Sequence, residues 1–132
     1  MENFLKPYTS QLLSLLRIVI GLMLFHHGTT KFLNFPVGQF NNTSPQTMVG
    51  AAGVLELVGG ALLLIGLFTR PVAFILSGFA AVAYFYAHSP RGLYPIYNGG
   101  ETVILLAFAL IYIAAAGGGA WSADRSFRGT KD

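Results

Sequence analysis

The stretch that decides the fold is MVGAAGVLELVGGALLLIGLF, residues Met48–Phe68, in which Glu56 is the one charged side chain. About 20 apolar residues are needed to cross the hydrocarbon core of a bilayer as a helix. A charged side chain at the centre of such a helix costs roughly 2.5–3.5 kcal/mol on insertion scales, so it normally faces a partner or a cavity. The stretch therefore predicts a membrane-spanning helix that turns Glu56 toward the interior of a helix bundle.

Three further apolar stretches predict helices over residues 10–33, 71–88 and 101–116. Pro36 marks the end of the first, and Pro71 starts the third at a position where a helix tolerates proline. A polar connector separates the first two helices, and a basic tail follows from residue 121 to 132. The fold class is therefore an all-α membrane protein, a four-transmembrane-helix bundle in which residues 1–132 form one domain.

The composition fits this prediction and excludes several functions. Hydrophobic residues make up 54% of the chain and charged residues 10%, against about 25% charged in soluble domains. The mean hydropathy is +0.61. Because the chain has no cysteine, thiol exchange, thiolate metal sites and iron–sulfur clusters held by its own thiols are excluded. The first apolar stretch is followed by His26 and His27, not by a small-residue cleavage site, so we expect it to be retained.

Positive charges predict the orientation in the membrane. With four spans, both termini and the connector between the second and third helices share one side. That side carries Lys6, Arg17, Arg70, Arg125, Arg128 and Lys131, and the other side carries Lys31 and Arg91. Because cytoplasmic loops are rich in Lys and Arg, we expect both termini in the cytoplasm (N-in, C-in) and the protein in a bacterial or archaeal plasma or inner membrane.

Charged side chains share helix faces with small residues. Glu56 is flanked by Gly53 and Gly60 on one face of its helix, and glycines let another helix approach closely. Arg17 and Lys31 lie on one stripe of the first helix, at helical spacing. Since buried charges are usually paired, we expect Glu56 within about 4 Å of Lys31 or Arg17.

Four motifs occur in order along most of the chain. They are Arg17…Gly21…His27-Gly28-x-x-Lys31, Gly53-x-x-Glu56-x-x-x-Gly60…Gly66-x-x-Thr69-Arg70, Asn98-Gly99-Gly100-Glu101 and Ser122-x-Asp124. With these motifs the chain resembles the DoxX family of small four-helix membrane proteins. The resemblance implies membrane redox chemistry, because the family includes a subunit of thiosulfate:quinone oxidoreductase, quinone-handling proteins and membrane partners of oxidative-stress complexes. Where relatives carry Gly-Pro-Gly before the terminal Ser-x-Asp, this chain has Gly117-Gly118-Gly119, and it lacks the redox cysteines of some relatives.

The orientation places most of the ionisable groups in the outer half of the membrane, where we expect one polar pocket. The pocket residues are His27, Lys31, Glu56, Tyr84, His88 and Glu101. In the first of three interpretations, the protein is a quinone-handling oxidoreductase or a membrane subunit of one. The expected catalytic residues are then His27, Lys31 and Glu56, with Arg17, Tyr84, His88 and Glu101 binding the substrate. Reduction of a quinone takes up two protons, and histidine titrates near neutral pH.

Two other interpretations stay open. A haem-binding bundle would use His27 and His88 as axial ligands. A non-catalytic scaffold, a partner subunit of a redox or stress complex, would use its polar core only to fix the register of the helices. No carboxylate metal site is expected, because the paired Glu-x-x-His motifs of di-iron bundles are lacking.

Expected partners follow from the same features. The lipid bilayer surrounds the helices, and glycines on several helix faces leave surface for a homodimer or a larger membrane complex. The chain has no evident electron carrier, so turnover would require a redox partner protein or a soluble reductant. Nucleic acid is not expected, despite a pI near 9.5, because the positive residues are not clustered with aromatics on a soluble face.

Overall fold

The computed structural model describes residues 2–35 and 47–128, and within these ranges every regular element is a helix. The four longer helices are α2 (Thr9–Leu33), α3 (Met48–Ile65), α4 (Thr69–Ala83) and α6 (Glu101–Ala116). The shorter ones are α1 (Glu2–Leu5), η1 (Lys6–Tyr8), η2 (Tyr84–His88), η3 (Ser89–Arg91), α5 (Pro95–Asn98) and α7 (Ala123–Arg128). Most of the predicted connector over 34–46 and the last residues of the tail lie outside the described ranges.

Three helical stretches of the described chain are long and apolar enough to cross a membrane, Asn3–Leu33, Met48–Ile65 and Thr69–Arg91. The fourth apolar helix, α6, has 16 residues. At 1.5 Å per residue it is about 24 Å long, shorter than the roughly 30 Å of a bilayer core. The all-helical membrane architecture is thus confirmed, while the fourth span and the orientation stay predictions.

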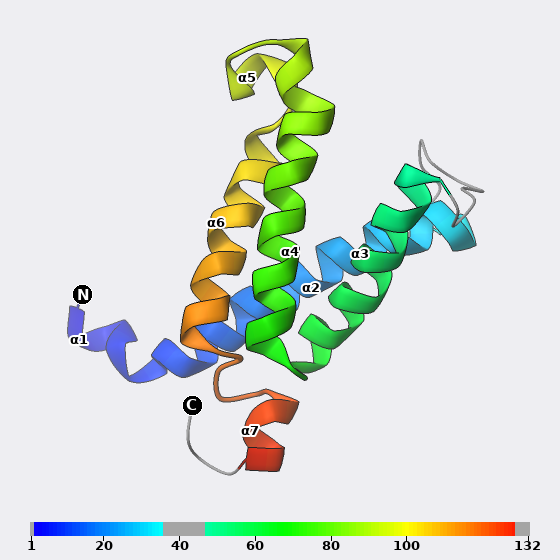
Figure 1. The fold of residues 1–132 in the computed structure, drawn as a ribbon. Coiled ribbons are helices and arrows are strands. Elements are labelled where there is room, and N and C mark those ends of the chain that lie inside the picture. Colours follow the sequence, from blue (N-terminus) through cyan, green and yellow to red (C-terminus); the bar gives the residue numbers. More distant parts are fainter. Residues whose placement is uncertain (1, 36–46, 129–132) are drawn as a thin grey trace.

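The helices form two pairs, not one bundle with a common interior along its length. Figure 1 shows that α2 lies beside α3 and that α4 lies beside α6, and that the two pairs meet at the end near α7 and diverge toward the other end. We call them the α2–α3 hairpin and the α4–α6 pair. The apolar core lies where they meet. Its buried members are Ile20, Leu24, Leu63, Ala73, Leu76, Leu106, Leu110 and Ile113.

Glycines bring the backbones of α2 and α3 into direct contact. A Cβ atom at Gly60 would lie 2.5 Å from the backbone nitrogen of Phe25, and one at Gly28 would lie 2.7 Å from the Cα of Leu57. No larger residue fits at either position without separating the helices. α3 then ends at Ile65, three residues before the predicted end, because Gly66 adopts a left-handed conformation (φ 74°).

The guanidinium of Arg17 is fully buried where the two helix pairs meet. Its Nη1 donates to the carbonyl oxygens of Leu63 (2.6 Å) and Leu64 (2.7 Å), at the C-terminal end of α3. Its Nε donates to Gly118 O (3.0 Å) and its Nη2 to Trp121 O (2.5 Å), both after the end of α6. One side chain of α2 therefore links the last carbonyls of α3, which lack partners within that helix, to the carbonyls of the segment after α6.

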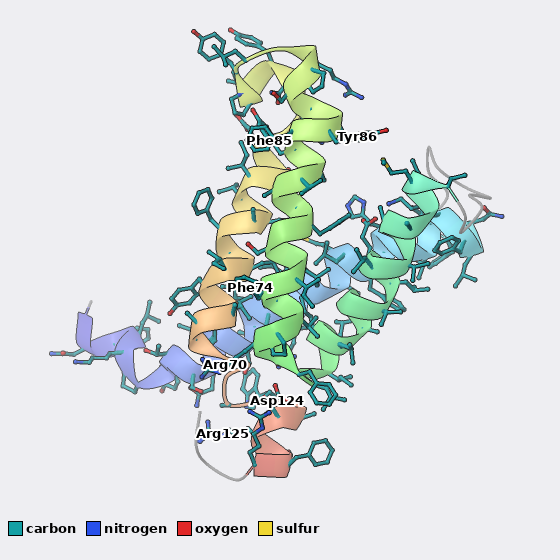
Figure 2. All side chains as sticks on the ribbon, viewed as in Figure 1. Arg70, Phe74, Phe85, Tyr86, Asp124 and Arg125 are labelled. Carbon is teal, nitrogen blue, oxygen red and sulfur yellow. The ribbon has the colours of Figure 1, made fainter. Side chains whose placement is uncertain are left out.

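Two more polar side chains strengthen this junction. Ser14 Oγ donates to Gly118 O (3.0 Å) and accepts from the backbone N–H of Trp121 (2.9 Å). Asp124 accepts from the backbone N–H groups of Phe68 and Thr69, each at 2.8 Å, and so caps the start of α4. We call Ser14, Arg17 and residues 117–124 the clasp. Figure 2 shows Asp124 and Arg125 in α7, below the start of α4; Asp124 contacts that start, whereas Arg125 donates to Ser10 of α2.

Replacing Arg17 by Met should lower the free energy of unfolding by more than about 3 kcal/mol. The substitution removes four hydrogen bonds from a charged group, each worth roughly 1.5–3 kcal/mol. Arg70 is the matched control, because it is exposed and donates to one carbonyl, that of Ala115. Arg70→Met should change stability by less than about 1 kcal/mol. Denaturant titration in mixed micelles measures both free energies of unfolding. Equal losses of stability in the two variants would show that the clasp does not hold the two helix pairs together.

The carboxylate of Asp124 predicts a pH dependence of stability. Burial disfavours its charged form, but the backbone N–H groups of Thr69 and Phe68 and the nearby positive charge of Arg128 outweigh burial, so the pKa of Asp124 lies below its ordinary value. A carboxyl with a lowered pKa in the folded state contributes stability above its unfolded pKa, about 3.9, and loses it as the pH falls further.

Asp124→Asn should therefore lower the stability by about 1 kcal/mol at neutral pH, the usual value of a helix cap. The difference from wild type should shrink as the pH falls below about 4. Melting temperatures of the two proteins between pH 3 and 7 measure it. A difference that stays constant over this range would contradict the role of the charge.

Candidate functional site

A buried ion pair connects α2 and α3 away from the clasp. Lys31 Nζ donates to Glu56 Oε1, and both side chains are buried, 9% and 6% exposed. Glu56 lies about 12 Å along α3 from Met48, at 1.5 Å per residue. The prediction that Glu56 pairs with Lys31 or Arg17 is confirmed for Lys31. Arg17, the other partner considered, is instead engaged with backbone carbonyls at the clasp.

His27 adds a titratable group to this pair. Its Nδ1 lies 3.6 Å from Glu56 Oε2, and its side chain is 59% exposed. His27 and Lys31 are four residues apart on α2, so they project from the same face. We call His27, Lys31 and Glu56 the trio. Within the described chain it combines a buried carboxylate and a buried ammonium with an accessible imidazole.

Glycines of the local sequence make room for the trio. A Cβ at Gly53, one turn before Glu56, would lie 2.9 Å from Lys31 Cδ and equally close to the ring of Phe32. The methylene chain of Lys31 therefore crosses α3 over Gly53 to reach Glu56. Close packing at Gly28 holds α2 near enough for this contact.

A second polar cluster surrounds Asn98, which is 1% exposed. Its Oδ1 accepts from the backbone N–H of Gly100 (2.8 Å), and its Nδ2 donates to Tyr84 Oη (3.1 Å) and Gly92 O (3.0 Å). His88 Nδ1 lies 3.0 Å from Asn98 O, and the rings of Tyr84 and His88 are stacked, with centroids 6.4 Å apart. Asn98 thus holds the connector between η2 and α6 in place.

The structure separates the residues that were expected to share one pocket. His27, Lys31 and Glu56 belong to the α2–α3 hairpin. Tyr84 and His88 lie in η2, which continues α4, and Glu101 starts α6; this end of the α4–α6 pair diverges from the hairpin (Figure 1). Glu101 is exposed at the start of α6. The structure therefore does not bring these residues into the single outer-half pocket that was expected, because the two helix pairs meet at the clasp and the apolar core and diverge beyond them.

Arg17, the remaining expected site residue, and His26, the neighbour of His27, are placed as follows. Arg17 lies in the clasp and does not reach the trio. His26 is exposed beside His27. Among residues 2–35 and 47–128, no group of three or more histidine, aspartate or glutamate side chains is arranged to hold a metal ion.

Sequence reasoning missed the structural roles of Asn98, Ser14 and Asp124. Two of them stand in motifs that the sequence displays, Asn98-Gly99-Gly100-Glu101 and Ser122-x-Asp124, so their positions were visible although their partners were not. Ser14 precedes Arg17 by three residues and therefore shares its helix face. This spacing from Arg17 was the only feature of the sequence that indicated the role of Ser14.

These features define the protein as a helical membrane protein with a buried ion pair between its first two long helices. The chain belongs to the DoxX family, whose model matches residues 12–89 and so includes the trio and Arg17. An uncharacterized protein of Haemophilus influenzae is 43% identical over 130 residues, which cover 95% of this chain and 97% of that relative. No solved structure matches the chain.

The ion pair predicts strong coupling between Lys31 and Glu56. Lys31→Met and Glu56→Leu should each lower the free energy of unfolding by about 3–5 kcal/mol, because each leaves a buried charge without its partner. The double variant should lose much less than the sum of the two. Glu56→Gln should be milder than Glu56→Leu, since the amide still accepts a hydrogen bond.

Denaturant titration of the four proteins in mixed micelles gives the coupling free energy. Glu101→Gln is the matched control: this exposed carboxylate interacts with the helix dipole, and its loss should change stability by less than about 1 kcal/mol. Additive effects of Lys31→Met and Glu56→Leu on stability would show that the two side chains do not interact.

Proposed function

We propose that the protein is the membrane component of a redox system and that its trio binds the ring of a quinone. The supporting observation is the accessible imidazole of His27 beside the buried Lys31–Glu56 pair, in an otherwise apolar hairpin. Family membership is a second, weaker support, because a fold hosts several functions.

In this proposal His27 donates a hydrogen bond to one carbonyl oxygen of the quinone. Nδ1 of His27 faces Glu56, which leaves Nε2 on the opposite side of the ring for the ligand. When the ring takes up two electrons, its two oxygens take up two protons. His27 acts as the imidazolium, with its Nδ1–H toward Glu56, and transfers one proton from Nε2 to the quinone. Water at the exposed ring supplies the second proton and returns the first to Nε2. The electron pair comes from a partner protein or a soluble reductant.

A specific observation favours the scaffold as a second candidate. The charges of Lys31 and Glu56 neutralise each other, and the methylene chain of Lys31 fills the space that a Cβ at Gly53 would occupy. A pair of this kind fixes the register of two helices without any chemistry. His27 distinguishes the two proposals. Its imidazole is 59% exposed, so it contributes little to fixing the register of α2 against α3 but is accessible to a ligand.

The haem alternative has less support. His88 Nδ1 is engaged with Asn98 O. His27 lies toward the end of α2 and His88 ends η2, which continues α4, and these ends of the two helix pairs diverge (Figure 1). These two histidines do not fit the opposite faces of one haem in this chain.

For the whole chain we propose four spans with both termini in the cytoplasm of a bacterial or archaeal cell. The clasp then lies on the cytoplasmic side and the trio in the outer half of the membrane. The excess of Lys and Arg at the clasp end supports this orientation. A homodimer or a larger complex would cover the divergent faces of the two helix pairs.

The proposal predicts quinone binding that depends on His27 and not on its neighbour. His27→Ala should weaken the binding of a short-chain ubiquinone analogue to the reconstituted protein about fivefold, the value of one hydrogen bond. His26→Ala should bind as wild type does, because His26 is not part of the trio. Equilibrium dialysis measures the affinities, and reduction is then followed with candidate partner proteins.

The same assay separates the two candidate functions. Equal binding by wild type, His27→Ala and His26→Ala would leave the trio a structural ion pair and favour the scaffold. Folding of each variant is checked by its melting temperature, so that a loss of binding is not confused with a loss of structure.

A further inference from the structure

An apolar groove runs along the α4–α6 pair, apart from the trio. Its volume is about 490 Å³, within the roughly 300–1,000 Å³ of pockets that bind small molecules. The side chains along it include Ser77, Ala81, Tyr84, Phe85, Phe108 and Ile111. Figure 2 shows Phe85 and Tyr86 on opposite sides of η2, which continues α4; Phe85 lines the groove and Tyr86 does not.

The groove offers one available polar hydrogen, that of the Tyr84 hydroxyl. The other hydroxyl on the groove, that of Ser77, donates to Ala107 O (2.7 Å). Asn98 Oδ1 accepts from the N–H of Gly100, so the orientation of the amide is fixed and Nδ2 must be the donor to Tyr84 Oη. Tyr84 Oη is therefore an acceptor in this contact, and its own hydrogen has no acceptor among the described residues.

The hydroxyl also lies at a defined level of the helix pair. Asn98 ends α5, directly before α6 begins at Glu101, so the atom 3.1 Å from its amide lies at the polar end of the apolar helices. Ester carbonyls of lipids occupy this boundary between hydrocarbon and headgroups. Tyr84 also starts a π-helical turn, in which Ser89 N–H donates to Tyr84 O. Such turns are rare and frequently occur at functional sites.

We propose that this groove binds one acyl chain of a membrane phospholipid, with its ester carbonyl oxygen accepting a hydrogen bond from Tyr84. The chain lies along the groove toward Ile111, where the walls are apolar. A single donor at the boundary suits one ester carbonyl, and the apolar remainder of the groove suits its hydrocarbon chain. The site is independent of the trio and of the quinone proposal.

Diester and diether phospholipids with the same headgroup and chains test the carbonyl directly, because the diether lacks it. The protein is equilibrated with an equal mixture of both in detergent, and the lipids retained are counted by native mass spectrometry. Wild type should retain the diester about fivefold over the diether, the value of one neutral hydrogen bond. Tyr84→Phe should retain both equally, at the level of the diether.

Two substitutions of neighbouring exposed residues test the groove. Ala81→Phe fills it and should abolish retention of both lipids. Val82→Phe adds the same ring beside the groove, at a residue that is 67% exposed and does not line it, and should retain lipid as wild type does. Equal retention of diester and diether by wild type, or equal effects of Ala81→Phe and Val82→Phe, would overturn the proposal. Displacement of the lipid by an equimolar short-chain quinone would also overturn it.

Discussion

The buried guanidinium of Arg17 is the interaction on which the rest of the structure depends. It joins the end of α3 to the segment after α6, and the neighbouring Asp124 caps the start of α4. Carbonyls at a helix end have no partner within the helix, and in a membrane little water reaches them. One planar side chain with several donors meets this need at two segments at once, which a lysine with its compact ammonium does not.

Joining the helix pairs at one end leaves their other ends separate. Each pair therefore builds its own polar site from local contacts. In the α2–α3 hairpin, glycines allow the approach that lets Lys31 reach Glu56. In the α4–α6 pair, Asn98 organises Tyr84 and His88. The two sites lie on helix pairs that diverge from each other. A quinone ring at the first site and an acyl chain at the second would therefore occupy separate places.

Much of the local chemistry was predictable from the sequence. Glu56 in an apolar stretch needs a partner because its burial is costly, and the glycines around it indicate where a helix approaches. Lys31 was therefore a predictable partner. The role of Arg17 was not, because its partners are main-chain carbonyls, which every residue carries and which leave no mark in the sequence. The same holds for Asn98 and Asp124, whose partners include the backbone.

The sequence by itself determined a helical membrane protein with charged groups turned inward, since hydrophobic length and the cost of buried charge act within one helix. The short sequence motifs also predicted membership of the DoxX family, which the family model confirms. Only the tertiary structure decided which polar groups meet. The angle between two helix pairs depends on contacts at their junction, and residues such as His27 and His88 lie far from it along their helices. Their separation is therefore a consequence of the clasp, not of their own sequence surroundings.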